Sequence, residues 1–288
     1  MQSANESSMS VADASPSGRA AYGINTYSFV QKRRAFDCLV QLADRGYRRF
    51  EVMLVPGHFW PSLDGKESRR AIATLVAQRQ LEILTLNQPA LDINLGSIVP
   101  EMRAHSCAMI ASAIELAAEW NASGVVINPG KPNPVLPASS TTLIDCFRRS
   151  LDILAPLARR YSVHLIVKNH PLSYLYRAEE LRSFFDGYGW DGIGLGYDFA
   201  NGYFGHEDAE EVLKIQDHVR FLYGGDTRLD SFQHAQIGNG NVPFAEISAM
   251  LHAADFRRPT ILEIVADVAD SAIDASVAYL DRIHWPAG

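Results

Sequence analysis

The sequence predicts a single closed (β/α)8 barrel, because eight short apolar segments alternate with eight helix-like segments along its 288 residues. Segments 124–128 and 164–168 are almost continuously apolar, as parallel strands covered on both faces should be. An open doubly wound sheet would carry a glycine fingerprint after its first strand, and residues 24–34 (INTYSFVQKRR) contain none. Together these observations favour the barrel.

Each element follows from a local pattern. Strands are expected where apolar residues run together, which gives 22–29, 47–54, 81–87, 124–128, 164–168, 192–198, 219–225 and 259–265. Helices are expected where apolar residues recur at helical spacing, which gives 33–46, 69–80, 102–121, 141–161, 177–189, 206–217, 243–256 and 268–283. Gly46 ends the first of these helices, since glycine readily adopts the left-handed conformation that stops a helix.

The first residues differ in composition from the rest. Residues 1–20 (MQSANESSMSVADASPSGRA) are rich in serine and alanine and lack the hydrophobic region of a signal peptide. We expect them to form a disordered N-terminal arm. Residues 21–288 are expected to form one barrel, with no linker and no second domain.

Composition excludes several classes of function. The net charge is −7 and no stretch concentrates lysine and arginine, so we expect no nucleic-acid partner. Cys38, Cys107 and Cys146 stand singly without metal-ligand spacing, which argues against a disulfide framework and predicts a reducing, cytoplasmic location. No apolar run reaches the roughly 18 residues that a membrane span needs.

Polar residues gather where the predicted strands end, which is the end of such barrels that carries chemistry. They are Asn25 to Ser28, Glu51, His58, Asn87, Gln88, Asn128, Lys168 to His170, Asp198, Asn201, Tyr223 to Asp226, and Glu263. Glu263 lies within the apolar run ILEIV. Because burying an unpaired charge is costly, Glu263 should have a partner.

Several stretches, in this order, resemble one known family: residues 87–97 with 101–130, LIVKNHP (165–171), GIGLGYDFAN (192–201), IGNGNVPFAEI (237–247) and TILEIV (260–265). The sequence resembles the sugar phosphate isomerase/epimerase superfamily, the xylose isomerase-like TIM barrels, from about Tyr22 to about Asp281. The resemblance implies a divalent metal held by Glu, Asp, His and Glu from strands five to eight. The matching positions here are Lys168, Asp198, Tyr223 and Glu263, so two of the four ligands remain.

The lysine at a ligand position changes the expected chemistry. At about 4 Å, opposite charges attract by about 4 kcal/mol at an effective dielectric near 20. We therefore expect the ammonium group of Lys168 to substitute for the cation between Asp198 and Glu263. The nearby carboxylates should keep Lys168 protonated, which disfavours an aldolase-like Schiff base. We expect no metal and no other cofactor; the alternative is a divalent metal (Mn, Mg or Zn) held by Asp198, His234 and Glu263.

These residues predict an isomerase, epimerase or lyase that abstracts a proton alpha to the carbonyl of a small, sugar-like compound. Its catalytic residues would be Lys168, Glu263 as general base, and Asp198. Substrate-binding roles are expected for His58, Trp60, Gln88, His170, Asn201, Arg228 and His234, of which Asn201 falls on the family's histidine after the Asp and His234 is expected on a loop. Two alternatives stay open: a metal-dependent sugar isomerase with rearranged ligands, and a non-catalytic binding or partner subunit. A homodimer is a further expectation from the resemblance.

Overall fold

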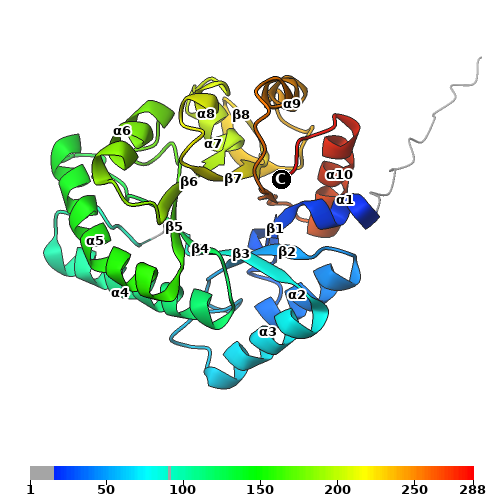
Figure 1. Cartoon of the computed structure of the whole chain (residues 1–288), viewed down its shortest axis with the longest axis horizontal. Helices are drawn as coiled ribbons and strands as arrows, with labels where there is room; N and C mark the ends of the chain where they lie inside the picture. Colours follow the sequence, from blue (N-terminus) through cyan, green and yellow to red (C-terminus); the bar gives the residue numbers. More distant parts are fainter. Residues whose placement is uncertain (1–15, 90–91) are drawn as a thin grey trace, which may run out of the picture.

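A computed structural model describes residues 16–89 and 92–288, and in it the predicted barrel is confirmed. Eight strands, each parallel to its neighbours, close in the order β1-β10-β7-β6-β5-β4-β3-β2. Figure 1 looks along the barrel and shows the helices as an outer ring around the strands. The carboxyl ends of all eight strands therefore meet at one end of the molecule.

All eight predicted strands are present. They are β1 (Gly23–Asn25), β2 (Arg49–Met53), β3 (Glu82–Asn87), β4 (Gly124–Ile127), β5 (His164–Lys168), β6 (Ile193–Asp198), β7 (Val219–Gly224) and β10 (Thr260–Leu262). The first is shorter than the predicted 22–29, because Asn25 Oδ1 accepts a hydrogen bond from the Tyr27 amide at 2.7 Å and the chain turns into the 3-10 helix η1 (Tyr27–Phe29). A separate antiparallel ribbon of β8 (Asp226–Arg228) and β9 (Ser231–Ala235) follows β7, and was not predicted.

The outer helices match the predicted segments with one main correction. They are α2 (Ala35–Asp44), α3 (Lys66–Arg79), α4 (Pro100–Glu119), α5 (Ser140–Tyr161), α6 (Ala178–Tyr188), α8 (Glu211–Lys214), α9 (Phe244–Ala253) and α10 (Ala269–Arg282). The predicted helix 206–217 is reduced to the single turn of α8. A helix that was not predicted, α7 (Phe199–Phe204), begins directly after β6, since the Asp198 side chain caps it by accepting a hydrogen bond from the Asn201 amide at 3.0 Å.

The predicted N-terminal arm falls partly outside the described residues, which begin at residue 16. Residues 16–20 of that segment belong to the short helix α1 (Pro16–Ala21), which lies beside α10 (Figure 1). Arg19 Nη2 contacts Asp274 Oδ2 of α10 at 3.3 Å. None of the helices in the described part of the chain combines the length and hydropathy that crossing a membrane requires. All three cysteines are buried and unpaired.

Two apolar layers position the site. The larger one lies between the strands and the surrounding helices and includes Trp120, Phe147 and Leu222. A smaller cluster fills the barrel interior and consists of Leu84, Val126, Ile166, Phe221, Tyr223 and Ile261. The barrel is therefore a packed core rather than a pore, and the polar side chains at its carboxyl end lie on an apolar floor.

Candidate functional site

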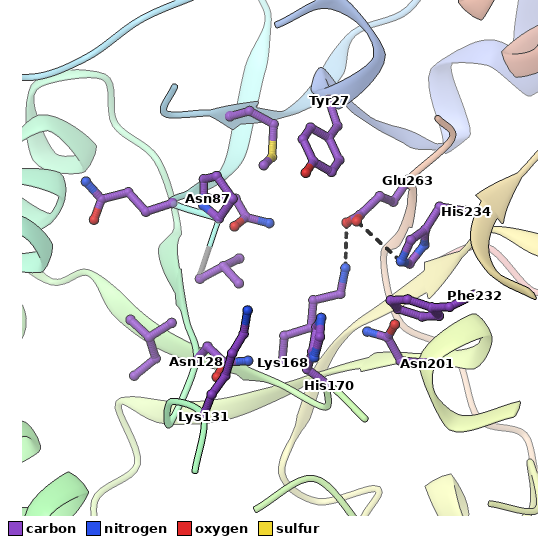
Figure 2. A pocket seen from close by; sticks show the side chains of 15 residues that line it. Tyr27, Asn87, Asn128, Lys131, Lys168, His170, Asn201, Phe232, His234 and Glu263 are labelled. Carbon is purple, nitrogen blue, oxygen red and sulfur yellow. Dashed lines mark hydrogen bonds and ion pairs between the residues drawn. The ribbon is translucent and has the colours of Figure 1, made fainter. Parts of the chain in front are cut away.

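A pocket of about 190 Å³ opens at the carboxyl end of the barrel (Figure 2). Six of the predicted site residues line it, namely Gln88, Lys168, His170, Asn201, His234 and Glu263. Its lining also includes Tyr27, Asn87, Asn128, Lys131 and Phe232. Asp198 lies just beneath, fully buried. The pocket combines apolar walls with a few convergent charged and amide groups, which is typical of a small-molecule site.

An ion cluster of three side chains forms the base of the pocket. Lys168 is the last residue of β5, Asp198 is the last residue of β6, and Glu263 follows β10. Lys168 Nζ lies 2.8 Å from Asp198 Oδ2 and donates a hydrogen bond to Glu263 Oε2 at 2.5 Å. The contact that we expected from the sequence is present.

The cluster fixes the charges of its members. Burial alone lowers the pKa of Lys168, but the carboxylates of Asp198 and Glu263 raise it by more, so it lies well above its ordinary value. Burial alone raises the pKa of Asp198, but the Lys168 ammonium lowers it by more, so it lies below its ordinary value. Lys168 is therefore a cation, and Asp198 an anion, across the physiological pH range.

Tyr223, at the position of the family's histidine ligand, supports the ammonium from below. Its ring centroid lies 4.0 Å from Lys168 Nζ, a distance that favours a cation–π interaction. A glycine makes room for the ring, since a Cβ at Gly196 would lie 2.7 Å from Tyr223 Cε2. The Tyr223 hydroxyl donates a hydrogen bond to Glu51 Oε2 at 2.6 Å. These two interactions hold the Tyr223 side chain inside the barrel.

Glu51, the third residue of β2, is a fully buried acid below the cluster. Its carboxylate accepts hydrogen bonds from Asn25 Nδ2 at 2.6 Å, Asn87 Nδ2 at 2.9 Å, Thr85 Oγ1 at 2.5 Å and the Tyr223 hydroxyl. Burial raises the pKa of Glu51 above its ordinary value, although Lys168 and these donors lower it. Asn25 Nδ2 also donates to Glu263 Oε2 at 3.1 Å, which links Glu51 to the ion cluster.

Two asparagines hold the Asp198 segment in place. Asn169 donates to the Asp198 carbonyl oxygen at 3.1 Å and accepts from the Asp198 amide at 2.7 Å. Asn201 Nδ2 donates to the Asn169 carbonyl oxygen at 2.7 Å. Among the described residues, Asn201 Oδ1 is buried without a hydrogen-bond partner, and so is Gln88 Oε1 on the other side of the pocket. Unpaired buried acceptors are costly, so these two atoms mark places where a ligand can donate a hydrogen bond.

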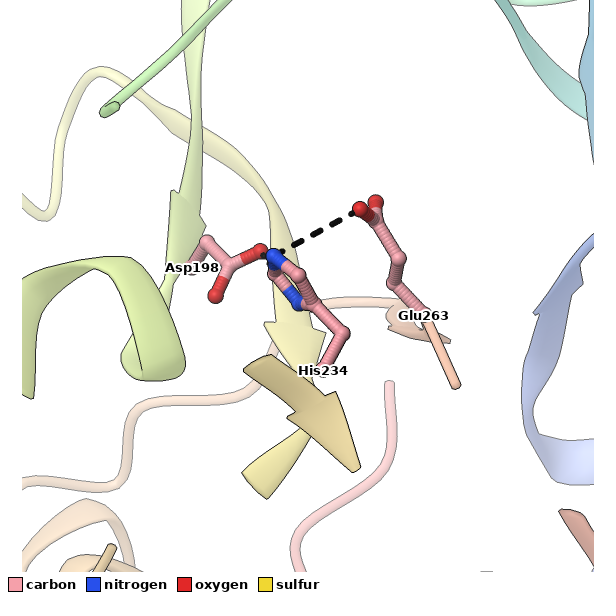
Figure 3. A group of neighbouring side chains, drawn as sticks. All are labelled: Asp198, His234 and Glu263. Atoms are coloured by element: carbon pink, nitrogen blue, oxygen red, sulfur yellow. Dashed lines mark ion pairs between the residues drawn. The ribbon is translucent and has the colours of Figure 1, made fainter. Parts of the chain in front are cut away.

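His234 lies on β9 rather than on the loop that we predicted, because residues 226–235 pair into the ribbon. The ribbon brings its ring between the two carboxylates (Figure 3). Nδ1 lies 3.8 Å from Asp198 Oδ2, and Nε2 lies 3.7 Å from Glu263 Oε1. Phe232, two residues earlier on β9, lies edge-on to the ring with centroids 5.6 Å apart. His234 and Phe232 form one wall of the pocket.

His170 lies on the loop after β5 and is neutral. Its Nδ1 accepts a hydrogen bond from the Leu172 amide at 3.2 Å, which leaves Nε2–H as the group available to a ligand. Burial, the largest cause, and the positive charges of Lys168 and Lys131 together lower the pKa of His170 to about 4. The ring can donate a hydrogen bond to a substrate oxygen without carrying charge.

Three residues that were predicted to contact the substrate, His58, Trp60 and Arg228, do not line the pocket. His58 is fully buried, because the chain turns between Val55 and Phe59 and points the ring inward. Its Nδ1 lies 2.6 Å from the Arg33 carbonyl oxygen and its Nε2 lies 3.0 Å from Thr26 Oγ1, so neither nitrogen is open to the pocket.

Trp60 and Arg228 also lie outside the lining of the pocket. Trp60 borders a neighbouring hollow that it shares with Gln88 and His105. Arg228 is exposed on β8, and its Nη2 donates to the Asn239 carbonyl oxygen at 3.1 Å. Sequence position alone did not show which way these loop side chains turn.

The closed parallel barrel with a charged pocket at its carboxyl end is the architecture of a large class of enzymes. A family model described as xylose isomerase-like TIM barrel matches residues 39–283, and the chain belongs to this family.

Similar solved structures include a D-tagatose 3-epimerase-like protein, with 20% identity, a TM-score of 0.79, and 91% of this chain and 96% of that chain covered. A D-psicose 3-epimerase determined in the presence of D-fructose has 15% identity and a TM-score of 0.76, with 93% and 99% covered. The IOLI protein with a bound zinc atom has 13% identity and a TM-score of 0.78, with 92% and 98% covered. At these identities the likeness establishes the fold. No curated protein sequence matches the chain significantly.

The residues present do not fit the four-ligand metal site that the family implies. The family resemblance places Lys168 and Tyr223 at two of the four ligand positions, and the hydroxyl of Tyr223 is bonded to Glu51. Asp198, His234 and Glu263 still offer one ligand atom each within 4.8 Å of one another. Lys168 Nζ, however, lies 2.8 Å and 2.5 Å from one oxygen of each acid, so its positive charge occupies the space between them and would repel a cation. An ion could bind there only if the ammonium group moved away.

Proposed function

We propose that the protein is an isomerase or epimerase of small sugar-like compounds that moves a proton alpha to a carbonyl and uses the Lys168 ammonium instead of a divalent cation. One observation carries the proposal: Lys168 Nζ lies at 2.8 Å and 2.5 Å from the two acids at the base of the pocket. A fixed positive charge at this place is what a developing enediolate oxygen requires.

Glu263 is the proposed base. Its Oε2 accepts hydrogen bonds from Lys168 and Asn25, which orients the carboxylate. Glu263 lines the pocket, and its Oε1 lies 3.7 Å from His234 Nε2. One oxygen thus anchors the group and the other is free to approach a substrate C–H bond.

The reaction balances without a further reactant. Glu263 removes the proton from the carbon next to the carbonyl, the C–H electrons form the C=C bond of an enediolate, and the carbonyl π electrons move to its oxygen. Lys168 donates a hydrogen bond to that oxygen. Return of the proton to the former carbonyl carbon, with the hydroxyl proton moving to the former carbonyl oxygen, gives an isomer. Protonation of the same carbon on its opposite face by a second acid, Lys168 or His170, gives an epimer; Glu263 then releases its proton to solvent and the second acid regains one from solvent.

The remaining polar groups suit a polyhydroxylated substrate. Asn201 Oδ1 and Gln88 Oε1 are buried acceptors without a partner in the part of the chain that the structure describes, so hydroxyl groups of a ligand can satisfy them. His170 supplies a neutral donor. Asp198 does not itself line the pocket; we assign it the role of holding Lys168 in place and protonated.

A second candidate function is a metal-dependent sugar isomerase. The observation that favours it is the proximity of Asp198, His234 and Glu263, whose ligand atoms lie within 4.8 Å of one another. This candidate requires Lys168 to swing out of the cluster when an ion such as Mn²⁺ or Zn²⁺ enters.

Exchange of substrate hydrogen with solvent tests the proposal. A panel of aldohexoses and ketohexoses in D2O, followed by proton NMR, should show deuterium incorporation at the carbon next to the carbonyl. Glu263→Gln and Lys168→Met should each reduce the exchange rate at least about 100-fold. The exposed Lys66→Met serves as the matched control. Exchange that survives in both variants, or that appears only with added metal, would contradict the mechanism; the latter result would favour the second candidate.

A further inference from the structure

Lys131 is a second lysine at the pocket, and the mechanism does not use it. It lies on the loop between β4 and α5 and lines the pocket with its side chain pointing inward (Figure 2). Lys168 is neutralised by two carboxylates, whereas Lys131 forms no ion pair with any residue that the structure describes. Lys131, an exposed residue, is therefore the lysine of the pocket lining whose charge has no carboxylate partner among the described residues.

The backbone around Lys131 is held firmly by two neighbouring loops. Asn94 Nδ2 donates to the Lys131 carbonyl oxygen at 3.0 Å, and Ser173 Oγ donates to the Gly130 carbonyl oxygen at 2.9 Å. The Tyr174 hydroxyl donates to the Pro129 carbonyl oxygen at 2.9 Å. Lys131 also precedes Pro132, which restricts its backbone to extended conformations.

A glycine completes this support. Gly130 adopts φ +119°, a conformation that L side chains rarely adopt, and a Cβ there would collide with Asn94 Oδ1. The Gly130 amide donates to Asn128 Oδ1 at 2.8 Å. These hydrogen bonds fix the backbone from which the side chain of Lys131, the one charged residue of this loop, enters the pocket.

Lys131 and His170 lie on neighbouring loops, and both line the pocket. The two loops are joined by the hydrogen bond from Ser173 Oγ to the Gly130 carbonyl oxygen. His170 offers a neutral N–H donor. A cation and a neutral donor together suit an anionic oxygen group.

We propose that the substrate is a sugar acid, and that Lys131 binds its carboxylate while the polyhydroxylated carbonyl part lies over Lys168 and Glu263. This inference rests on the proposed function for the nature of the rest of the substrate. It goes further in assigning a single negative charge to the end of the substrate that does not react.

Phosphate fits this corner less well than carboxylate. Proteins usually bind phosphate through arginine forks or several free backbone amides. Among the described residues that line the pocket there is no arginine, and the Gly130 amide is already bonded to Asn128. One lysine and one imidazole N–H match the charge and size of a carboxylate.

Calorimetric titration of the full chain tests the inference with ligands that share one carbon skeleton: D-fructose, D-fructuronate and D-fructose 6-phosphate, and the corresponding D-tagatose series. The carboxylate of at least one series should bind at least about tenfold more tightly than the neutral sugar, because a hydrogen bond to a charged group is involved. Lys131→Met should abolish this difference and leave the affinity for the neutral sugar unchanged. Lys66→Met, which removes an exposed lysine elsewhere, should retain it.

Binding is measured without turnover, so this test and the exchange test on Lys168 can fail separately. Equal affinities for neutral and carboxylate ligands, no binding by either series, or an unaltered preference in Lys131→Met would overturn the inference. A phosphate ester that binds more tightly than the carboxylate would also overturn the assignment to a sugar acid. Loss of the preference in the Lys66→Met control would show that general surface charge, rather than Lys131, determines it.

Discussion

Replacing Lys168 by methionine should destabilise the protein strongly. The substitution removes the ammonium group and leaves Asp198 and Glu263 buried without a cation; their side chains are 0% and 8% exposed. At an effective dielectric near 20, the contacts at 2.8 Å and 2.5 Å are each worth about 6 kcal/mol of attraction, most of which offsets the desolvation of the three ions. Removing one partner of a buried pair costs about 3–5 kcal/mol. The melting temperature should fall by about 10 °C.

The destabilisation caused by Lys168→Met should decrease as the pH falls. Lys168 has a raised pKa, so its contribution is present below the ordinary value of 10.5 and is lost only as the pH rises through its folded pKa. Asp198 has a lowered pKa, so its contribution is present above the ordinary value of 3.8 and is lost as the pH falls through its folded pKa. Both are therefore present at pH 5 and at pH 7.5. In Lys168→Met the bare acids can take up protons on acidification, so the destabilisation should be smaller at pH 5 than at pH 7.5.

Urea unfolding at both pH values measures this effect, with Lys66→Met as a control expected to lie within about 0.5 kcal/mol of the parent. The triple variant Lys168→Met, Asp198→Asn, Glu263→Gln removes all three charges with little change in volume. It should regain at least half of the lost stability. A single variant within about 1 kcal/mol of the parent at pH 7.5, or a triple variant no more stable than the single one, would refute the reasoning.

Three further predictions concern the surroundings of the cluster. Tyr223→Phe removes a donor to a buried carboxylate and should cost about 1–3 kcal/mol in urea unfolding, while an unchanged unfolding curve would count against this hydrogen bond. Glu51 has a raised pKa, so its buried charge costs more stability as the pH rises through its folded pKa; the stability of Glu51→Gln relative to the parent should therefore be higher at pH 7 than at pH 5. A constant difference would speak against a raised pKa. An NMR titration of the folded protein should place the midpoint of His170 at about 4, and Lys131→Met should move it upward; a midpoint near 6.5 would be incompatible with the buried, positively charged surroundings.

The barrel and the ion cluster could be predicted from the sequence because both follow from the order of the strands. Once eight alternating strands close, the residues that end β5, β6 and β10 must lie close together, and Lys168, Asp198 and Glu263 occupy these positions. Neither prediction depends on the direction in which a loop side chain points. The same logic placed Gln88 and Asn201 at the pocket.

The network below the cluster could not be predicted. Glu51 was recognisable as a polar residue near the end of a strand, but its bond to Tyr223 crosses the interior of the barrel and depends on the register of β2 and β7. Gly196, which makes room for that tyrosine, has no local signature that distinguishes it from other strand glycines.

The orientation of side chains outside the barrel strands also could not be predicted from the sequence. His58 turns inward to Thr26, and the ribbon that carries His234 consists of two short strands with weak alternation. Lys131 was missed because a lone lysine in a proline-rich loop carries no pattern. Two structural observations make Lys131 a candidate binding residue. Hydrogen bonds hold its loop in place, and it forms no ion pair among the described residues, whereas Lys168 forms two.

Crystals of the protein grown with excess Mn²⁺, measured at an X-ray wavelength where manganese scatters anomalously, test most directly whether an ammonium group stands in for a metal. Our account predicts no manganese peak among Asp198, His234 and Glu263, with Lys168 Nζ in contact with both acids. A manganese ion bound to both carboxylates, with the lysine side chain displaced, would contradict it.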